Sequence, residues 1–184
     1  FNEQGSFTTK PDIAVVVFGE NAYAEIQGDI QNLSTLEVDS KTKAGLKTIQ
    51  ALKAQGIPVV ALLLSGRPLW VNKELNLADA FVAAWQPGTE GAGVADVLVA
   101  KIDGTPNADF NGRLSFSWPA TPCQTPLNKT DADYKPLFPF DYGLRYSSSL
   151  TPWQPLNEST SDYAYGCRLK NQLPSPRRLE FKEK

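Results

Sequence analysis

The sequence contains no histidine, and this absence narrows the chemistry open to the protein. Serine and cysteine nucleophiles that rely on an imidazole base are excluded, as is every metal site that needs an imidazole ligand. The only two cysteines, Cys123 and Cys167, lie too far apart for a metal-binding pair, and they are compatible with a disulfide or with two free thiols. We therefore expect no metal and no cofactor, and carboxylates must perform any acid–base chemistry.

Long apolar runs and an excess of basic residues are also missing. The longest apolar run, Val59 to Leu64, is much shorter than the roughly 20 residues of a membrane helix, so we expect no membrane span. A net charge of -2 provides no basic field for phosphates, so we expect no nucleic-acid partner and an uncharged ligand. The sequence has no methionine and opens at Phe1 without a signal-peptide pattern, so we expect a piece of a longer protein.

The residues that are present predict a single α/β domain. Of 184 residues, 41% are apolar and 21% are charged, which is typical of a domain with a packed core. Continuous apolar runs over 13–18, 59–64 and 80–85 predict strands that are buried on both faces. Helical patterns over 41–55, 69–77 and from Thr89 or Glu90 onward separate and follow these strands. This alternation predicts a three-layer α/β/α sandwich with a mainly parallel sheet.

The second half of the chain has weaker patterns. An Asn111-Gly112 turn leads into Arg113 to Trp118, whose apolar and polar residues alternate and predict an edge strand. Beyond Pro119 the composition predicts ordered surface loop, and the polar residues 147–184 predict a C-terminal extension or linker.

Unusual sequences follow each of the three predicted strands, over 19–29, 65–68 and 85–91. Ligands of open parallel sheets bind beyond the carboxyl ends of the strands, so these segments indicate the binding edge. The first segment opens a loop of about 20 residues, a length that is uncommon in a compact domain unless the loop is functional. On the residues alone, its carboxylates Glu20, Glu25 and Asp29 also fit a solvated loop, with Glu20 paired to Arg67 and Trp85 in the core.

Five segments, taken in order, resemble the second domain of the family 3 glycoside hydrolases, the β-glucosidases and exo-β-glucanases. The resemblance runs from about residue 12 to residue 146. Its segments are Gly19-Glu20-x-x-Tyr23-x-Glu25-x-x-Gly28-Asp29, Leu64-Ser65-Gly66-Arg67-Pro68, Ala80 to Gly91, Asp109 to Leu114, and Pro136 to Leu144. Each segment is weak alone, whereas five in the right order are highly specific.

The resemblance implies a flavodoxin-like sandwich over 1–146 that works beside a (β/α)8 barrel. The barrel, which holds an aspartate nucleophile in such enzymes, is absent from this chain. The resemblance also implies that Glu25, the second glutamate of the first segment, is the general acid/base. Tyr23, Glu20, Arg67 and Trp85 are the expected substrate-binding residues around it, and Glu20 is also expected to be structural, fixed by hydrogen bonds to Arg67 or nearby amides.

The function implied by the resemblance is that of a retaining β-glucosidase or exo-β-1,3(4)-glucanase. Such an enzyme releases glucose from the nonreducing ends of β-glucans or cello-oligosaccharides. The expected partners are then the saccharide and the barrel, and the chain alone is expected to be inactive. The expected location is periplasmic or extracellular, which a disulfide would fit. The alternative is a non-catalytic carbohydrate-binding or scaffold module. A nucleotide-binding flavodoxin-like domain is disfavoured because the first loop has no glycine-rich phosphate cradle.

Overall fold

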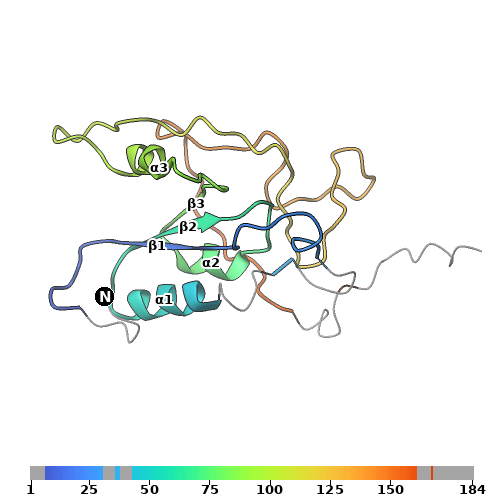
Figure 1. Cartoon of the computed structure of the whole chain (residues 1–184), viewed down its shortest axis with the longest axis horizontal. Coiled ribbons are helices and arrows are strands. Elements are labelled where there is room, and N and C mark those ends of the chain that lie inside the picture. The colour runs from blue at the N-terminus through green and yellow to red at the C-terminus, as the bar shows by residue number, and fades with distance from the viewer. Residues whose placement is uncertain (1–6, 31–35, 38–42, 161–166, 168–184) are drawn as a thin grey trace, which may run out of the picture.

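The computed structural model of the chain describes residues 7–30, 36–37, 43–160 and 167 (Figure 1). Strands and helices alternate in the order that the apolar runs predicted. They are β1 (Ala14–Gly19), α1 (Lys43–Ala54), β2 (Val59–Leu64), α2 (Asn72–Leu77), β3 (Ala80–Ala83) and α3 (Gly91–Leu98). No helix in these ranges combines the length and the apolar composition that crossing a membrane requires.

The three strands form a parallel sheet in the order β1-β2-β3, which confirms the predicted α/β class. In the sheet, Val16 lies beside Ala61, and Ala61 lies beside Phe81. Helices α1 and α2 cover one face, and α3 lies on the other side of the strands, although α3 buries none of its side chains (Figure 1). Because the strands are parallel, their carboxyl ends share one edge.

The core lies between the sheet and α1. Ile49 and Leu52 of α1 are buried against the side chains of β1 and β2, as the helical spacing predicted. Gly45 lets this helix approach the sheet closely, since a Cβ there would lie 2.6 Å from the Cβ of Phe18. Gly56 ends the helix with a φ of +66°, a left-handed conformation that glycine adopts without steric cost.

The prediction that every strand is buried on both faces holds for β2 and is wrong for β1 and for β3, in which no residue is fully buried. Val16 and Phe18 are buried against the helices, whereas Val15 and Val17 on the opposite face are 51% and 56% exposed. β1 lies at an edge of the sheet, and its helical contacts come from α1, on the Val16 face. An apolar run therefore predicted the strand correctly but not the layer that covers it.

The prediction of an edge strand over 113–118 is also wrong. This segment pairs with 137–142 at two separate points, around Leu114 and around Trp118, instead of forming a continuous ladder. Pro139 lies in the partner segment between these two points and has no N–H group to donate, which interrupts the pairing. Likewise, β3 ends at Ala83, before the predicted residue 85.

The described part of the chain beyond residue 119 is irregular but ordered by side-chain hydrogen bonds. Asn76 of α2 donates to the carbonyl of Leu156 at 2.9 Å, and Asn72 donates to the carbonyl of Asn157 at 2.8 Å. Cys123 and Cys167 form a disulfide, which resolves the two states that the sequence left open. The boundary between residues 146 and 147 stays a prediction.

Candidate active site

Backbone hydrogen bonds bring together the segments that follow the three strands. The Glu20 N–H donates to the carbonyl of Leu64 at 2.8 Å, and the Ser65 N–H donates to the carbonyl of Trp85 at 3.1 Å. The loop after β1, drawn in blue beyond the end of that strand, therefore begins beside the end of β2 (Figure 1). The predicted binding edge is built from adjacent chain segments.

Glu20 and Arg67 form an ion pair at this edge, as predicted. The guanidinium donates from Nε and Nη2 to Oε1 of Glu20, at 2.9 and 2.7 Å. Arg67 Nη1 also donates to the carbonyl of Gly28 at 2.5 Å. The second carboxyl oxygen of Glu20 is buried and has no hydrogen-bond partner among the described residues. The pair is thus occupied internally, which favours support of the loop over direct contact with a ligand.

Tyr23 lies against the same arginine, with the guanidinium carbon 4.6 Å from the centre of its ring. Burial, and then the negative charge of Glu20, raise the pKa of the Tyr23 phenol, although the charge of Arg67 acts in the opposite direction. The phenol therefore stays protonated at neutral pH and can donate a hydrogen bond. Because the side chain is 37% exposed, Tyr23 borders the edge that a ligand would reach.

Glu25 is exposed at the outer part of the loop. Within the described residues, its carboxyl makes no hydrogen bond and no ion pair. Its neighbour Ile26 has a φ of +73°, and the N–H of Gln27 donates to the carbonyl of Glu25 at 2.9 Å. This is a tight γ-turn with a left-handed central residue, which is rare and strained for a β-branched side chain. Sequence reasoning missed this turn, because isoleucine carries no signal for positive φ.

Trp85 lies at the end of β3 and faces the core more than the loop. Its ring centre is 6.1 Å from that of Trp118, a buried core residue, and the indole is partly buried. A φ of +56° at Trp85 turns the chain out of the strand and explains why β3 ends early. The structure thus brings Glu20, Tyr23 and Arg67 together, with Trp85 on the adjoining segment and Glu25 further out.

The resulting edge has two exposed carboxyls, Glu25 and Asp29, and a neutral phenol, together with the ion pair of Glu20 and Arg67. A free carboxyl can transfer a proton to or from a bound molecule, and a phenol and an indole can contact a sugar ring. Glu25 is exposed, and no residue described in the structure faces its carboxyl with a hydrogen bond or an ion pair. Acid–base catalysis on a glycosidic bond requires a second carboxyl and a facing wall.

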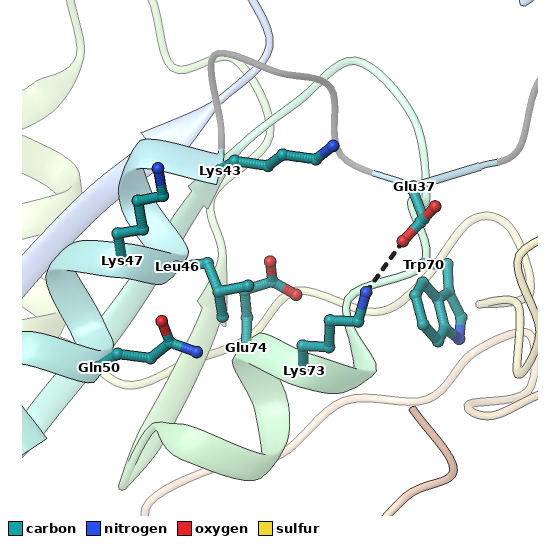
Figure 2. A pocket seen from close by; sticks show the side chains of 8 residues that line it. All are labelled: Glu37, Lys43, Leu46, Lys47, Gln50, Trp70, Lys73 and Glu74. Carbon is teal, nitrogen blue, oxygen red and sulfur yellow. Dashed lines mark hydrogen bonds and ion pairs between the residues drawn. The ribbon is translucent and has the colours of Figure 1, made fainter. Parts of the chain in front are cut away.

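A separate hollow with a volume of about 200 Å³ lies between α1 and α2. Figure 2 shows the carboxyl of Glu74 pointing toward its middle, and Lys73 paired with Glu37 at 3.1 Å beside it. Glu74 is only 7% exposed, and its carboxyl has no hydrogen bond or ion pair to another residue in the described ranges. The side chains lining this hollow are those of Glu37, Lys43, Leu46, Lys47, Gln50, Trp70, Lys73 and Glu74.

Burial raises the pKa of the Glu74 carboxyl above its ordinary value, and the nearby charges of Glu37 and Glu158 act in the same direction. The backbone N–H of Glu74 itself and the charge of Lys73 oppose them. A raised folded-state pKa means that the folded protein binds this proton more tightly than the unfolded chain. The contribution to stability is complete below the unfolded pKa and is lost as the pH rises through the raised folded pKa.

We predict that Glu74→Gln increases the free energy of unfolding at pH 7 by about 1 kcal/mol, because the variant removes a buried charge that no other residue pairs within the described ranges. The gain should shrink toward pH 4, where Glu74 is protonated. Urea unfolding of both proteins between pH 4 and pH 8 measures the difference. Glu90→Gln, at an exposed carboxylate, is the matched control and should leave stability within about 0.5 kcal/mol at each pH. A loss of stability at pH 7 for Glu74→Gln would contradict the prediction.

The fold and the binding edge together define a class of protein. It is an α/β sandwich domain that presents a carboxyl from the loop after its first parallel strand. The sequence profile described as "Glycosyl hydrolase family 3 C-terminal domain" matches residues 1–146. The chain therefore belongs to this family, which confirms the resemblance of the five segments and the flavodoxin-like fold.

Solved and curated relatives agree with this family. The exo-1,3/1,4-β-glucanase from a Pseudoalteromonas species is 55% identical with a TM-score of 0.79, over 85% of this chain and 19% of that one. A β-glucosidase from Listeria innocua is 29% identical with a TM-score of 0.59, over 74% of this chain and 21% of that one. The periplasmic β-glucosidase of Salmonella typhimurium is 34% identical over 74% of this chain and 19% of its own length. The chain thus spans about a fifth of the length of these glycoside hydrolases.

Proposed function

We propose that this chain is the second domain of a retaining β-glucosidase or exo-β-1,3(4)-glucanase, and that it contributes the general acid/base, Glu25. The observation that carries the proposal is the exposed carboxyl of Glu25, unpaired among the described residues, on a loop whose base is held by Glu20 and Arg67. The 55% identity to an exo-1,3/1,4-β-glucanase supports the substrate class, β-glucans and oligosaccharides that end in glucose.

The chemistry proceeds in two steps and requires a carboxylate from a second domain, the barrel that the family resemblance implies. First, that carboxylate attacks the anomeric carbon while Glu25 gives its proton to the departing glycosidic oxygen. Second, the Glu25 carboxylate takes a proton from water as the water oxygen attacks the anomeric carbon and releases the enzyme carboxylate. The two carboxyl groups of a retaining enzyme lie roughly 5 to 5.5 Å apart, so the second domain has to dock directly over the Glu25 loop.

The other predicted site residues have separate roles in this proposal. Tyr23 is exposed enough to donate to a sugar hydroxyl, and Trp85 offers the partly exposed side of its ring as an apolar surface. Glu20 and Arg67 support the loop, because their polar atoms are directed to each other and to Gly28. The ligand carries no charge, which suits a protein with a net charge of -2.

We also propose a periplasmic or extracellular location. The disulfide between Cys123 and Cys167 supports this location, since disulfides persist in oxidising compartments. The similarity to a periplasmic β-glucosidase supports it as well.

The test of this proposal is a hybrid enzyme in which this chain replaces the matching segment of the Pseudoalteromonas exo-glucanase. We expect the hybrid to release glucose from oligosaccharides with β-1,3 or β-1,4 linkages. A folded hybrid that binds these saccharides without cleaving them would instead support a non-catalytic binding module. The unmodified host enzyme is the positive control.

A further inference from the structure

Arg67 contacts residues 20–28, the first part of the loop after β1, at both ends of this segment and in its middle. Two of its nitrogens bind Glu20 at the start of the loop, and the third binds the carbonyl of Gly28 near the end. Between these points its guanidinium covers the ring of Tyr23, at 4.6 Å from the ring centre. One side chain therefore closes the loop that carries Glu25.

The arginine is itself fixed to the sheet. Ser65, which is 1% exposed, donates from its hydroxyl to the carbonyl of Arg67 at 2.8 Å. The N–H of Ser65 binds the carbonyl of Trp85, and the N–H of Glu20 binds the carbonyl of Leu64. The guanidinium thus extends from a segment that hydrogen bonds to the ends of β2 and β3 hold in place.

Close packing around Tyr23 leaves the closed loop little freedom. A Cβ at Gly28 would lie 2.1 Å from Cδ2 of the Tyr23 ring, and a Cβ at Gly66 would lie 2.6 Å from its hydroxyl oxygen. Neither glycine can carry a side chain unless the ring moves. The ring therefore fills the space between the loop and the segment that bears Arg67.

The strained turn at Glu25 requires such support. Ile26 holds a φ of +73°, yet its side chain is 77% exposed and gains little from packing. Backbone strain of this kind persists only where the surroundings impose it. Backbone hydrogen bonds within residues 24–29 form the turn, and the contacts of Arg67 at Glu20 and Gly28, on either side of it, connect it to the sheet.

We propose that Arg67 is the positioning residue of the acid/base: it holds both ends of the 20–28 loop, so that the turn at Ile26 presents Glu25 in one direction. This inference rests on the proposed function of Glu25. Arg67 touches no substrate, and it acts through the loop. Its loss should therefore impair proton donation much more than the binding of the sugar, to which Arg67 contributes only through Tyr23.

The test compares Arg67→Lys and Glu25→Gln in the hybrid enzyme, using aryl β-glucosides with a series of leaving groups. Lysine keeps a positive charge for Glu20 but lacks the planar fork that reaches Gly28 and covers Tyr23. We expect Arg67→Lys to lower kcat/KM about 10- to 100-fold for the poorest leaving groups and less than about threefold for the most activated ones. The inhibition constant of gluconolactone, a sugar-like ligand, should stay within about threefold of the unmodified value.

Two further variants complete the comparison. Arg67→Gln keeps a donor for Gly28 but loses the charge for Glu20, and we expect the same dependence on leaving group with a larger loss. Lys53→Met removes an ion pair at the opposite end of the strands, in which Nζ of Lys53 lies 2.7 Å from Oδ2 of Asp79. It is the matched control for loss of an ion pair and should lower the melting temperature without changing the dependence on leaving group.

The outcomes separate this inference from the proposed function. If Glu25→Gln leaves the poor leaving groups unaffected, the proposed function fails, and the inference fails with it. Suppose instead that Glu25→Gln has its expected effect while the Arg67 variants lower kcat/KM equally for all leaving groups, or for none of them. In that case Arg67 has only a structural role. Non-additivity gives a further check, because Arg67→Lys combined with Glu25→Gln should be no slower than Glu25→Gln alone.

Discussion

In the hybrid enzyme, Glu25→Gln is expected to lower kcat/KM for poor leaving groups by about 10²- to 10⁴-fold, the usual contribution of general acid catalysis. Glutamine is nearly the same size as glutamate but has no proton to give to the glycosidic oxygen. Activated leaving groups depart without protonation, so their kcat/KM should change little. The protein should fold normally, because the Glu25 carboxyl makes no hydrogen bond or ion pair within the described ranges.

The second step supplies an independent check on this assignment. Without the Glu25 carboxylate no base activates water, so the covalent glycosyl-enzyme should accumulate and kcat for activated substrates should fall. Azide needs no base, and its addition should restore turnover and yield a β-glycosyl azide. Mass spectrometry of the trapped enzyme and of the azide product measures both effects.

Glu20→Gln is the matched control in the same loop. Its Oε1 accepts two hydrogen bonds from Arg67, so the variant should reduce the free energy of unfolding by about 1–3 kcal/mol, the range for a charged hydrogen-bond partner. Azide should not accelerate this variant. Azide rescue of Glu20→Gln and not of Glu25→Gln would reverse the assignment of the acid/base.

The sequence predicted those features of the fold that depend on local pattern. Continuous apolar runs located all three strands, and helical spacing located α1 with Ile49 and Leu52 on its buried face. The exposure of Val15 and Val17 was not predictable, because burial depends on what covers a strand and a run of valines is the same in either case. For the segment 113–118, alternation alone did not reveal that a proline in the partner segment, Pro139, interrupts the pairing.

A similar division applies to the candidate site. The pairing of Glu20 with Arg67 was predictable, since adjacent parallel strands place their carboxyl ends side by side and opposite charges lie there. The bond from Arg67 to the carbonyl of Gly28 was not, because backbone carbonyls carry no residue-specific signal. The left-handed conformation of Ile26, next to Glu25, was not predictable either, because isoleucine carries no signal for a positive φ.

The purified 184-residue chain is expected to hydrolyse no aryl β-glucoside, even an activated one, at a rate above that of buffer. A retaining mechanism requires a nucleophilic carboxylate as well as the acid/base, and the proposed function assigns that carboxylate to a second domain. Glu20 is held by Arg67, and its other oxygen is buried, so neither oxygen can approach an anomeric carbon. Glu25 is exposed to water, so no closed pocket orients a sugar against it.

Asp29 is the remaining carboxylate of the segment 19–29, and it decides how unexpected turnover by the isolated chain would be interpreted. It is exposed and lies close to Glu25 in the chain, so it is the residue of this segment that would give the domain a complete pair. The measurement is release of dinitrophenolate from the activated glucoside by the isolated chain and by its Asp29→Asn variant, with the hybrid enzyme as the positive control. Turnover by the chain that disappears in Asp29→Asn would show that the domain holds both carboxyl groups of the reaction. That result would remove the need for a second domain from the proposed mechanism.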